Sequence, residues 1–113
     1  MVKVSRAEVS RGEIWLINLD PTVGSEIKKS RPCIVVSPQE MNQYLRTVII
    51  APMTTKGSPA SFRIPVTHDN QKGLILLDQI RTIDKVRLVK QLGSITTKTL
   101  NLCLNGLQET FAR

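Results

Sequence analysis

The sequence predicts a mainly β fold: a small, mostly antiparallel β-barrel with one helix packed across it at the C-terminal end. Proline and glycine residues divide the 113-residue chain into short pieces, and most of these pieces are runs of β-branched or aliphatic residues. Such runs between turn signals are typical of strands. One C-terminal segment has the apolar spacing of a helix instead. We expect a single domain over residues 1–113, with residues 1–10 as a flexible extension.

Strands are expected over residues 12–19, 33–37, 48–53, 62–66 and 74–80. Pro32, Pro38, Pro52 and Pro65 stand at or near the ends of these runs, where a strand tolerates the missing N–H. The polar segment 20–30 joins the first two strands, and its turn-forming Asp20-Pro21 start predicts a mobile surface loop.

Two helices are expected. A short one covers residues 39–45, and a longer one begins after Thr96 or Thr97 as its N-cap. The longer helix has apolar residues at i, i+3, i+4 and i+7 spacing, which we expect to make core or dimer contacts: Leu100, Cys103, Leu104, Leu107 and Phe111. Of the four aromatic residues in the chain, at least two are expected in the core.

The formal net charge of +7 indicates an anionic partner. The partner could be nucleic acid, an acidic protein or an anionic membrane surface. The chain could also be a soluble basic protein without such a partner, and composition alone does not choose among these four. The apolar runs are too short to cross a bilayer, and no signal-peptide pattern follows the basic start. Cys33 and Cys103 each lie in an apolar run, so we expect buried, reduced thiols in a cytoplasmic protein.

The residue types exclude several kinds of catalysis. The single histidine, His68, lies in a polar turn that we expect to face solvent, and no metal-ligand spacing surrounds it, so neither a metal site nor a histidine-dependent nucleophile is expected. No phosphate-binding loop or dinucleotide fingerprint is present, and no cofactor is expected. The abundant Arg, Lys, Thr and Ser side chains suit phosphate oxygens. RNA carries its own nucleophile, the 2′-hydroxyl, so a protein of this composition could cleave it without a metal.

Five motifs in order along the chain resemble the MazF/PemK/Kid family of bacterial toxins. They are GEIW at 12–15, LDPTVGSE at 19–26, SRPCIVVS at 30–37, APMTT at 51–55 and LDQIRTIDK at 77–85. The resemblance implies an SH3-like barrel of the CcdB/MazF toxin type that forms a homodimer and cuts single-stranded RNA, mostly messenger RNA, without a metal. It also implies a cognate acidic antitoxin that covers the RNA groove, and binding to operator DNA only as a complex with that antitoxin.

The resemblance also implies roles for single residues. Arg31 and Thr54 fall on the catalytic arginine and threonine of the family, and Glu26 falls on a glutamate of the first loop. From the residues alone, Arg31 could be a solvated strand-end charge and Thr54 a turn hydroxyl, while Glu26 could be the base or could order its loop. The candidate RNA-binding residues are Ser25, Lys28, Lys29, Thr55, Lys56, Gln79 and Arg81. Arg63 is a further candidate for phosphate contact.

Two departures from the family pattern favour its MazF-like branch. Some members have a histidine at the position of Ser25 and an arginine at the position of Leu76, and use both with an aspartate at Asp78. Only Asp78 is retained here, so a constellation of histidine, arginine and aspartate is not expected. Asp78 and Arg81 lie in one strand-like segment, where an internal pair between them is the preferred interpretation and RNA contact the second. A non-nuclease, CcdB-like toxin that binds gyrase remains an alternative, as does a family member that only binds antitoxin or DNA.

Overall fold

The computed structural model describes residues 8–19 and 30–113. Within them the chain forms β1 (Glu13–Asn18), β2 (Ser30–Val35), α1 (Gln39–Tyr44), β3 (Thr47–Thr54), β4 (Arg63–His68), β5 (Gln71–Leu76), β6 (Arg81–Asp84), β7 (Leu88–Ser94) and α2 (Thr97–Phe111). Two short 3-10 helices, η2 (Leu77–Gln79) and η3 (Lys85–Arg87), flank β6. The expected mainly β fold with a C-terminal helix is confirmed.

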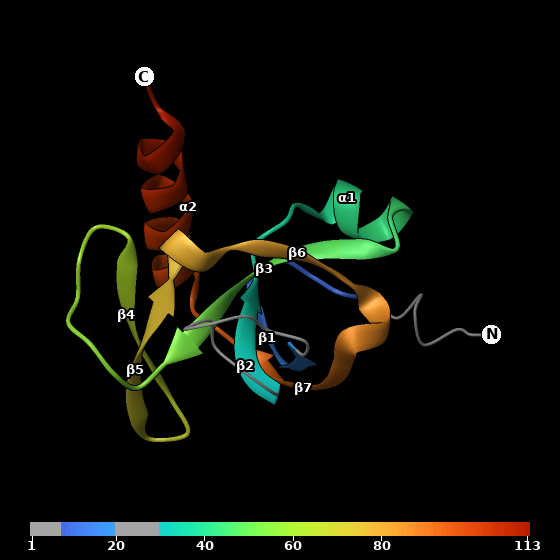
Figure 1. Cartoon of the computed structure of the whole chain (residues 1–113), viewed down its shortest axis with the longest axis horizontal. Coiled ribbons are helices and arrows are strands. Elements are labelled where there is room, and N and C mark those ends of the chain that lie inside the picture. Colours follow the sequence, from blue (N-terminus) through green and yellow to red (C-terminus); the bar gives the residue numbers. More distant parts are fainter. Residues whose placement is uncertain (1–7, 20–29) are drawn as a thin grey trace.

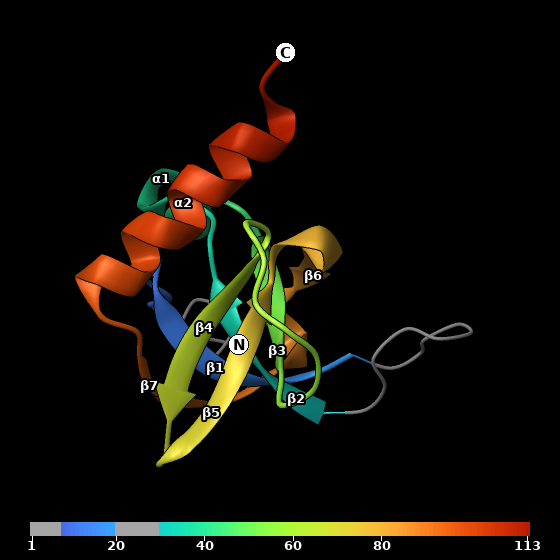
Figure 2. The same cartoon turned by 90° about the vertical axis from the view of Figure 1, so that its left-hand side faces the viewer.

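The strands form a curled antiparallel sheet in the order β4-β5-β3-β2-β1-β7, and β6 pairs with the first half of β3. The β4–β5 hairpin projects on one side of the molecule and β6 and β7 lie on the other (Figure 1). Asp69 and Asn70 form the two-residue hairpin turn, both with positive φ, as type I′ turns require. Helix α2 crosses one face of the sheet (Figure 2).

Apolar side chains of β2 and β3 alternate between two cores, one on each face of the sheet. The helix-side core lies under α2 and includes Ile14, Ile34, Met53, Ile75 and Cys103. The far-side core occupies the opposite face and consists of Val9, Ile17, Leu19, Cys33, Val35, Val48, Ile50 and Ile83. Both cysteines are free and buried, as expected. The two phases of this alternation determine which polar residues at the strand ends share a face.

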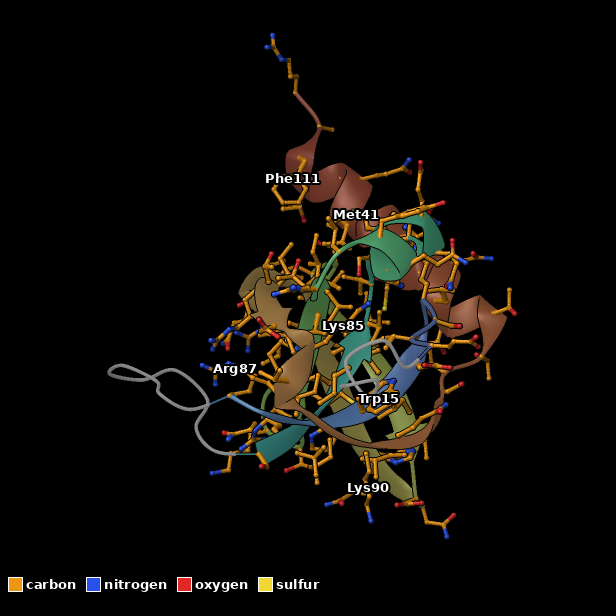
Figure 3. All side chains as sticks on the ribbon, turned by 90° about the vertical axis from the view of Figure 1, so that its right-hand side faces the viewer. Trp15, Met41, Lys85, Arg87, Lys90 and Phe111 are labelled. Atoms are coloured by element: carbon orange, nitrogen blue, oxygen red, sulfur yellow. The ribbon has the colours of Figure 1, made fainter. Side chains whose placement is uncertain are left out.

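A buried polar network holds α1 against the sheet. The Ser37 hydroxyl donates to Asn42 Oδ1 at 2.6 Å, and Asn42 Nδ2 donates to the Ser37 carbonyl at 3.0 Å. The buried Lys85 ammonium donates to the Asn42 carbonyl, so η3 is tied to α1. Lys85 lies between these two elements in Figure 3. Because Lys85 directly follows β6, this network also fixes the end of the strand that carries Arg81.

The boundaries differ from the sequence predictions in places. The segment 74–80 is a strand only as far as Leu76, where η2 turns the chain away. Strands β6 and β7 were not predicted, because β6 is only four residues long and the side chains of β7 are mostly exposed. The short helix was predicted within one residue, and Thr96 is the N-cap of α2, since its hydroxyl accepts the Thr99 N–H.

The expectation that two aromatic residues belong to the core is wrong. Tyr44 is 80% exposed, Phe111 71% and Phe62 43%, while Trp15 is partly buried against the far-side core. Aliphatic residues and Cys103 fill the space under α2 instead. Phe111 stands in the last turn of α2, near the free C-terminal end (Figure 3), so it is a surface residue of this chain.

Candidate active site

Arg31 and Thr54 face each other across two neighbouring strands. Arg31 is the second residue of β2, and Thr54 is the last residue of β3. The strands pair with Cys33 opposite Pro52 and Ile34 opposite Ala51, and continuing that antiparallel register places Arg31 opposite Thr54. Arg31 Nη1 donates to the Met53 carbonyl at 3.3 Å, which brings the guanidinium to the end of β3.

The alternation of the strands places both side chains on the face of the far-side core. Arg31 has the phase of Cys33 and Val35, and Thr54 has the phase of Val48 and Ile50. Two side chains that are directly opposite on one face of a sheet have Cβ atoms about 4.5–5.5 Å apart. A charge and a hydroxyl separated by 23 residues in the sequence therefore lie on the same face of the sheet, at the ends of neighbouring strands.

Arg31 carries a buried donor that lacks an acceptor. Its Nε is buried and makes no hydrogen bond within the part of the chain that the structure describes. A buried N–H without a partner costs free energy, and an arginine fork binds phosphate oxygens in pairs. A phosphate oxygen at this place would satisfy the donor, so the arrangement suits an anionic ligand.

The Thr54 hydroxyl is oriented by the turn that follows it. Its oxygen accepts the Lys56 backbone N–H at 3.2 Å, and Gly57 continues the turn with a φ of +101°. Among the described residues the hydroxyl donates no hydrogen bond, so its hydrogen can be donated to a ligand. Thr54 is therefore arranged as a hydrogen-bond donor. Thr55 and Lys56 are exposed beside it.

Arg81 adds a second positive charge to this face. It lies opposite Ile50 in the β3–β6 pair and has the phase of Ile83, which belongs to the far-side core. Burial raises the pKa of the Cys33 thiol to about 12, against the opposing effect of the nearby Arg31 and Arg81 charges. The structure thus brings both guanidinium groups near Cys33, and this thiol stays protonated rather than acting as a nucleophile.

The expected pair between Asp78 and Arg81 is wrong. Asp78 lies in η2, and both of its carboxylate oxygens accept hydrogen bonds from Arg63, Nε to Oδ1 at 3.2 Å and Nη2 to Oδ2 at 3.0 Å. This hydrogen bonding is the main reason that the pKa of Asp78 is lowered. Within residues 8–19 and 30–113, Arg81 has no carboxylate partner. The expected continuous strand is broken here, because Asp78 lies in η2 and Arg81 begins β6.

The remaining candidates divide into two groups. Gln79 is partly buried in η2, two residues before Arg81. Ser25, Glu26, Lys28 and Lys29 lie outside the described residues. Asn18 pairs with Ser30 where β1 ends and β2 begins, at the end of the sheet that carries Arg31.

Arg87 is a cation that sequence reasoning missed. It lies in η3, and its Nη1 donates to the Asn18 carbonyl at 3.2 Å, which brings it to the same end of the sheet (Figure 3). Nothing in the local pattern distinguishes Arg87 from other surface arginines, since only the tertiary path of η3 brings it there.

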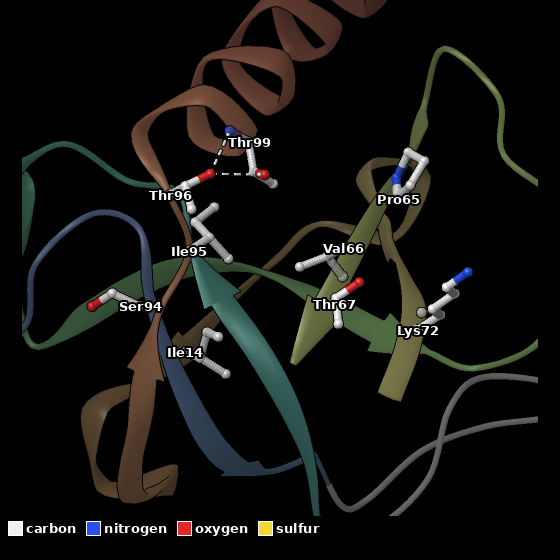
Figure 4. Close-up of a pocket in the computed structure, with 10 residues that line it drawn as sticks. Ile14, Pro65, Val66, Thr67, Lys72, Ser94, Ile95, Thr96 and Thr99 are labelled. Carbon is white, nitrogen blue, oxygen red and sulfur yellow. Dashed lines mark hydrogen bonds between the residues drawn. The ribbon is translucent and has the colours of Figure 1, made fainter. Parts of the chain in front are cut away.

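Other kinds of site find little support in the described residues. They contain no group of three His, Cys, Asp or Glu side chains that could hold a metal ion. His68 is the last residue of β4, and its side chain is only 19% exposed, in place of the expected solvent-facing turn. A cleft of about 530 Å³ lies between the β4–β5 hairpin and the start of α2, and none of the candidate residues lines it (Figure 4).

A comparison with known families decides the identification. The family described as PemK-like, MazF-like toxins of type II toxin–antitoxin systems matches residues 10–111. The chain belongs to this toxin family. Endoribonuclease PemK of Escherichia coli is 34% identical to the toxin over 108 residues, covering 90% of this chain and 81% of PemK. Endoribonuclease MazF of Staphylococcus saprophyticus is 33% identical over 103 residues, covering 86% of each chain.

Solved structures share the fold of the toxin. MazF from Deinococcus radiodurans superposes with a TM-score of 0.80 at 22% identity, covering 93% of this chain and 97% of that one. A mycobacterial endoribonuclease solved with its cognate antitoxin gives a TM-score of 0.76 at 22% identity, with 89% and 92% covered. The family match supports the toxin–antitoxin assignment and sets aside the alternative of a CcdB-like gyrase-binding toxin. No described helix is long and apolar enough to span a membrane.

Proposed function

We propose that this toxin is a metal-independent endoribonuclease that cuts single-stranded RNA beside Arg31 and Thr54. The observation that carries the proposal is the buried Nε of Arg31, which has no hydrogen-bond partner among the described residues and belongs to a residue that the strand register places opposite Thr54. Two relatives more than 30% identical over most of the chain are named endoribonucleases, which supports the same reaction class.

The reaction needs no reactant beyond the RNA. The 2′-hydroxyl oxygen attacks the adjacent phosphorus, and the bond from phosphorus to the 5′-oxygen breaks. The 2′-hydroxyl loses its proton and the leaving 5′-oxygen gains one, so the products are a 2′,3′-cyclic phosphate and a 5′-hydroxyl. What the protein must supply is positive charge and hydrogen-bond donors around the phosphorus, together with a base and an acid.

Arg31 supplies the charge in this scheme. Its free donors bind the non-bridging phosphate oxygens, which gain negative charge in the transition state. Thr54 donates its hydroxyl hydrogen to one of the same oxygens. Glu26 is proposed as the base for the 2′-hydroxyl, with ordering of its loop as the other role. Arginine is a poor proton donor, because its pKa exceeds about 12.

Positive and polar residues around this pair extend the binding surface for RNA. Arg81 has the side-chain phase of the same face, Thr55 and Lys56 directly follow Thr54, and Gln79 stands two residues before Arg81, which supports a role for each in RNA binding. Ser25, Lys28 and Lys29 complete the proposed RNA contacts. The net charge of +7 also suits an acidic antitoxin that competes with RNA for this surface. We further propose a cytoplasmic homodimer that binds operator DNA only together with its antitoxin.

The proposal is tested with a synthetic single-stranded RNA in excess EDTA. Cleavage should persist, and mass spectrometry should find 2′,3′-cyclic phosphate and 5′-hydroxyl ends. A 2′-deoxy nucleotide placed just before the cut should abolish cleavage, whereas the same replacement several positions away should not. Cleavage of the deoxy substrate at the original bond, or loss of activity in EDTA that added Mg²⁺ restores, would overturn the proposed mechanism.

A further inference from the structure

Strand β5 approaches the backbone of Thr54 unusually closely. Thr54 pairs with Leu74, and the residue before Leu74 is Gly73. A Cβ atom added to Gly73 would lie 2.7 Å from the Thr54 carbonyl oxygen. Ordinary contacts between carbon and a carbonyl oxygen begin at about 3.3 Å. Only the hydrogen of a glycine fits between β5 and Thr54.

The backbone conformation of Gly73 does not itself require glycine. Gly12, Gly57 and Gly93 have positive φ angles, whereas Gly73 does not. Any L-residue could adopt the conformation of Gly73 if the Thr54 carbonyl were not there. The close approach to Thr54 is therefore the constraint that explains a glycine in the middle of this strand, where glycine otherwise weakens pairing.

Leu74 lies next to the turn that follows Thr54. It is buried and lies opposite Thr54 in the register. Its Cδ1 lies 3.6 Å from the position of a Cβ on Gly57. Gly57 ends the turn in which the Lys56 N–H is donated to the Thr54 hydroxyl. Strand β5 thus passes close to both the Thr54 carbonyl and the turn that orients the Thr54 hydroxyl.

We infer that Gly73 and Leu74 are positioning residues that set the place of the Thr54 hydroxyl. The inference rests on the proposed function, since it presumes that Thr54 acts in cleavage. Leu74 is buried and Gly73 has no side chain, so neither is proposed to contact the RNA. Gly73 allows β5 to lie close enough to fix the Thr54 backbone, and Leu74 packs against the following turn. Misplacement of a catalytic group by about 1 Å can cost on the order of a hundredfold in rate.

Gly73→Ala is the direct test. The added methyl must open the gap to Thr54 by roughly 0.6 Å to reach ordinary contact. We expect kcat to fall about tenfold to a hundredfold, while KM for the RNA stays within about twofold, because binding uses other groups. Leu74→Ala is a second variant that removes contacts instead of adding a clash, and it should lower kcat in the same way.

The decisive comparison repeats both changes in a Thr54→Ala background. If Gly73 and Leu74 act through Thr54, Gly73→Ala and Leu74→Ala should cost nothing further in kcat once the hydroxyl is gone. Gly106→Ala is the matched control, because its methyl would lie 2.7 Å from Leu77 Cδ1, a clash that does not involve Thr54. It should lower the melting temperature and leave kcat of the folded protein unchanged in both backgrounds.

The outcomes separate the inference from the proposed function. Full activity of Thr54→Ala would contradict the role of Thr54 itself. Loss of activity in Thr54→Ala, combined with equal kcat losses from Gly73→Ala in both backgrounds, would refute the positioning role alone. Circular dichroism at the assay temperature establishes that each variant is folded. If Gly73→Ala does not fold, the Leu74→Ala pair decides the question by the same comparison.

Discussion

Replacing Arg31 by alanine should abolish most cleavage while the fold survives. Arginine has five N–H donors, and one of them binds the Met53 carbonyl here. Two charge-assisted hydrogen bonds to the transition state, at about 1.5–3 kcal/mol each, amount to a loss of about 3–6 kcal/mol. That corresponds to a fall of roughly 10²–10⁴-fold in kcat/KM. Arg31→Lys keeps the positive charge but cannot donate two parallel hydrogen bonds as a guanidinium does, so kcat/KM should fall less than in Arg31→Ala but still measurably.

The same structure predicts little loss of stability. Arg31→Ala removes a hydrogen bond to Met53, worth about 1 kcal/mol, and also removes a buried Nε that lacks an acceptor in the described part of the chain. The free energy of unfolding, measured by urea denaturation, should therefore change by less than about 1 kcal/mol, since the two effects oppose each other. A drop of several kcal/mol would mean that Arg31 is chiefly a structural residue.

The assay is single-turnover cleavage of a fluorogenic RNA with the toxin in excess. Arg46→Ala is a suitable control, because Arg46 is exposed and precedes β3 at the end opposite Thr54. It should cleave at nearly the rate of the unchanged toxin. Arg31→Ala activity within about threefold of that control would refute the reasoning, since it would leave no room for even one charge-assisted hydrogen bond.

Three further predictions follow from the site. Thr54→Ser should keep most activity, whereas Thr54→Val should lose about tenfold to a hundredfold in kcat, because only serine retains the hydroxyl donor. Equal kcat values for these two variants would exclude a role of the hydroxyl. Cys33→Ala should keep its activity, and the native Cys33 thiol, with its pKa near 12, should resist iodoacetamide at pH 8. The Arg63–Asp78 pair lowers the pKa of Asp78, so Asp78→Asn should lower the melting temperature at pH 7. That difference should shrink as the pH falls below the ordinary aspartate pKa, and it should disappear only below the lowered pKa that Asp78 has in the folded protein. A difference that does not shrink with falling pH would not come from the charge.

The strand ends that carry Arg31 and Thr54 could largely be predicted from the sequence. Pro32 and Pro52 indicate strand ends, and Arg31 and Thr54 lie close to them in the sequence, at the ends of β2 and β3. The alternation of apolar residues predicts which side chains of each strand share a face. The register that places Arg31 opposite Thr54 could not be predicted. A helix and not a tight turn connects β2 to β3, so no turn geometry fixes their pairing. The family resemblance, rather than local chemistry, selected these two residues.

Contacts between residues far apart in the sequence explain where the sequence predictions failed. The aliphatic run 74–80 hides the turn at η2, so Asp78 was expected to pair along its own segment and not with Arg63. Strand β7 escaped prediction because its exposed residues do not alternate with buried ones. Gly73 shows no local reason for being glycine, and only the path of β3 beside β5 supplies one. Local patterns report burial and turns, whereas such pairings depend on the tertiary path.

The central claim is that Arg31 holds the phosphate at which RNA is cut. It is tested most directly by ¹⁵N NMR of the arginine Nε–H groups, with the Arg31 signal assigned by its loss in Arg31→Lys. The toxin is titrated with a cleavable sequence that carries a 2′-deoxy nucleotide just before the cut. The account predicts that the Arg31 Nε–H signal shifts and exchanges more slowly with water on binding, because a donor with no acceptor in residues 8–19 and 30–113 gains a phosphate oxygen. An unchanged Arg31 signal at saturating RNA would contradict it.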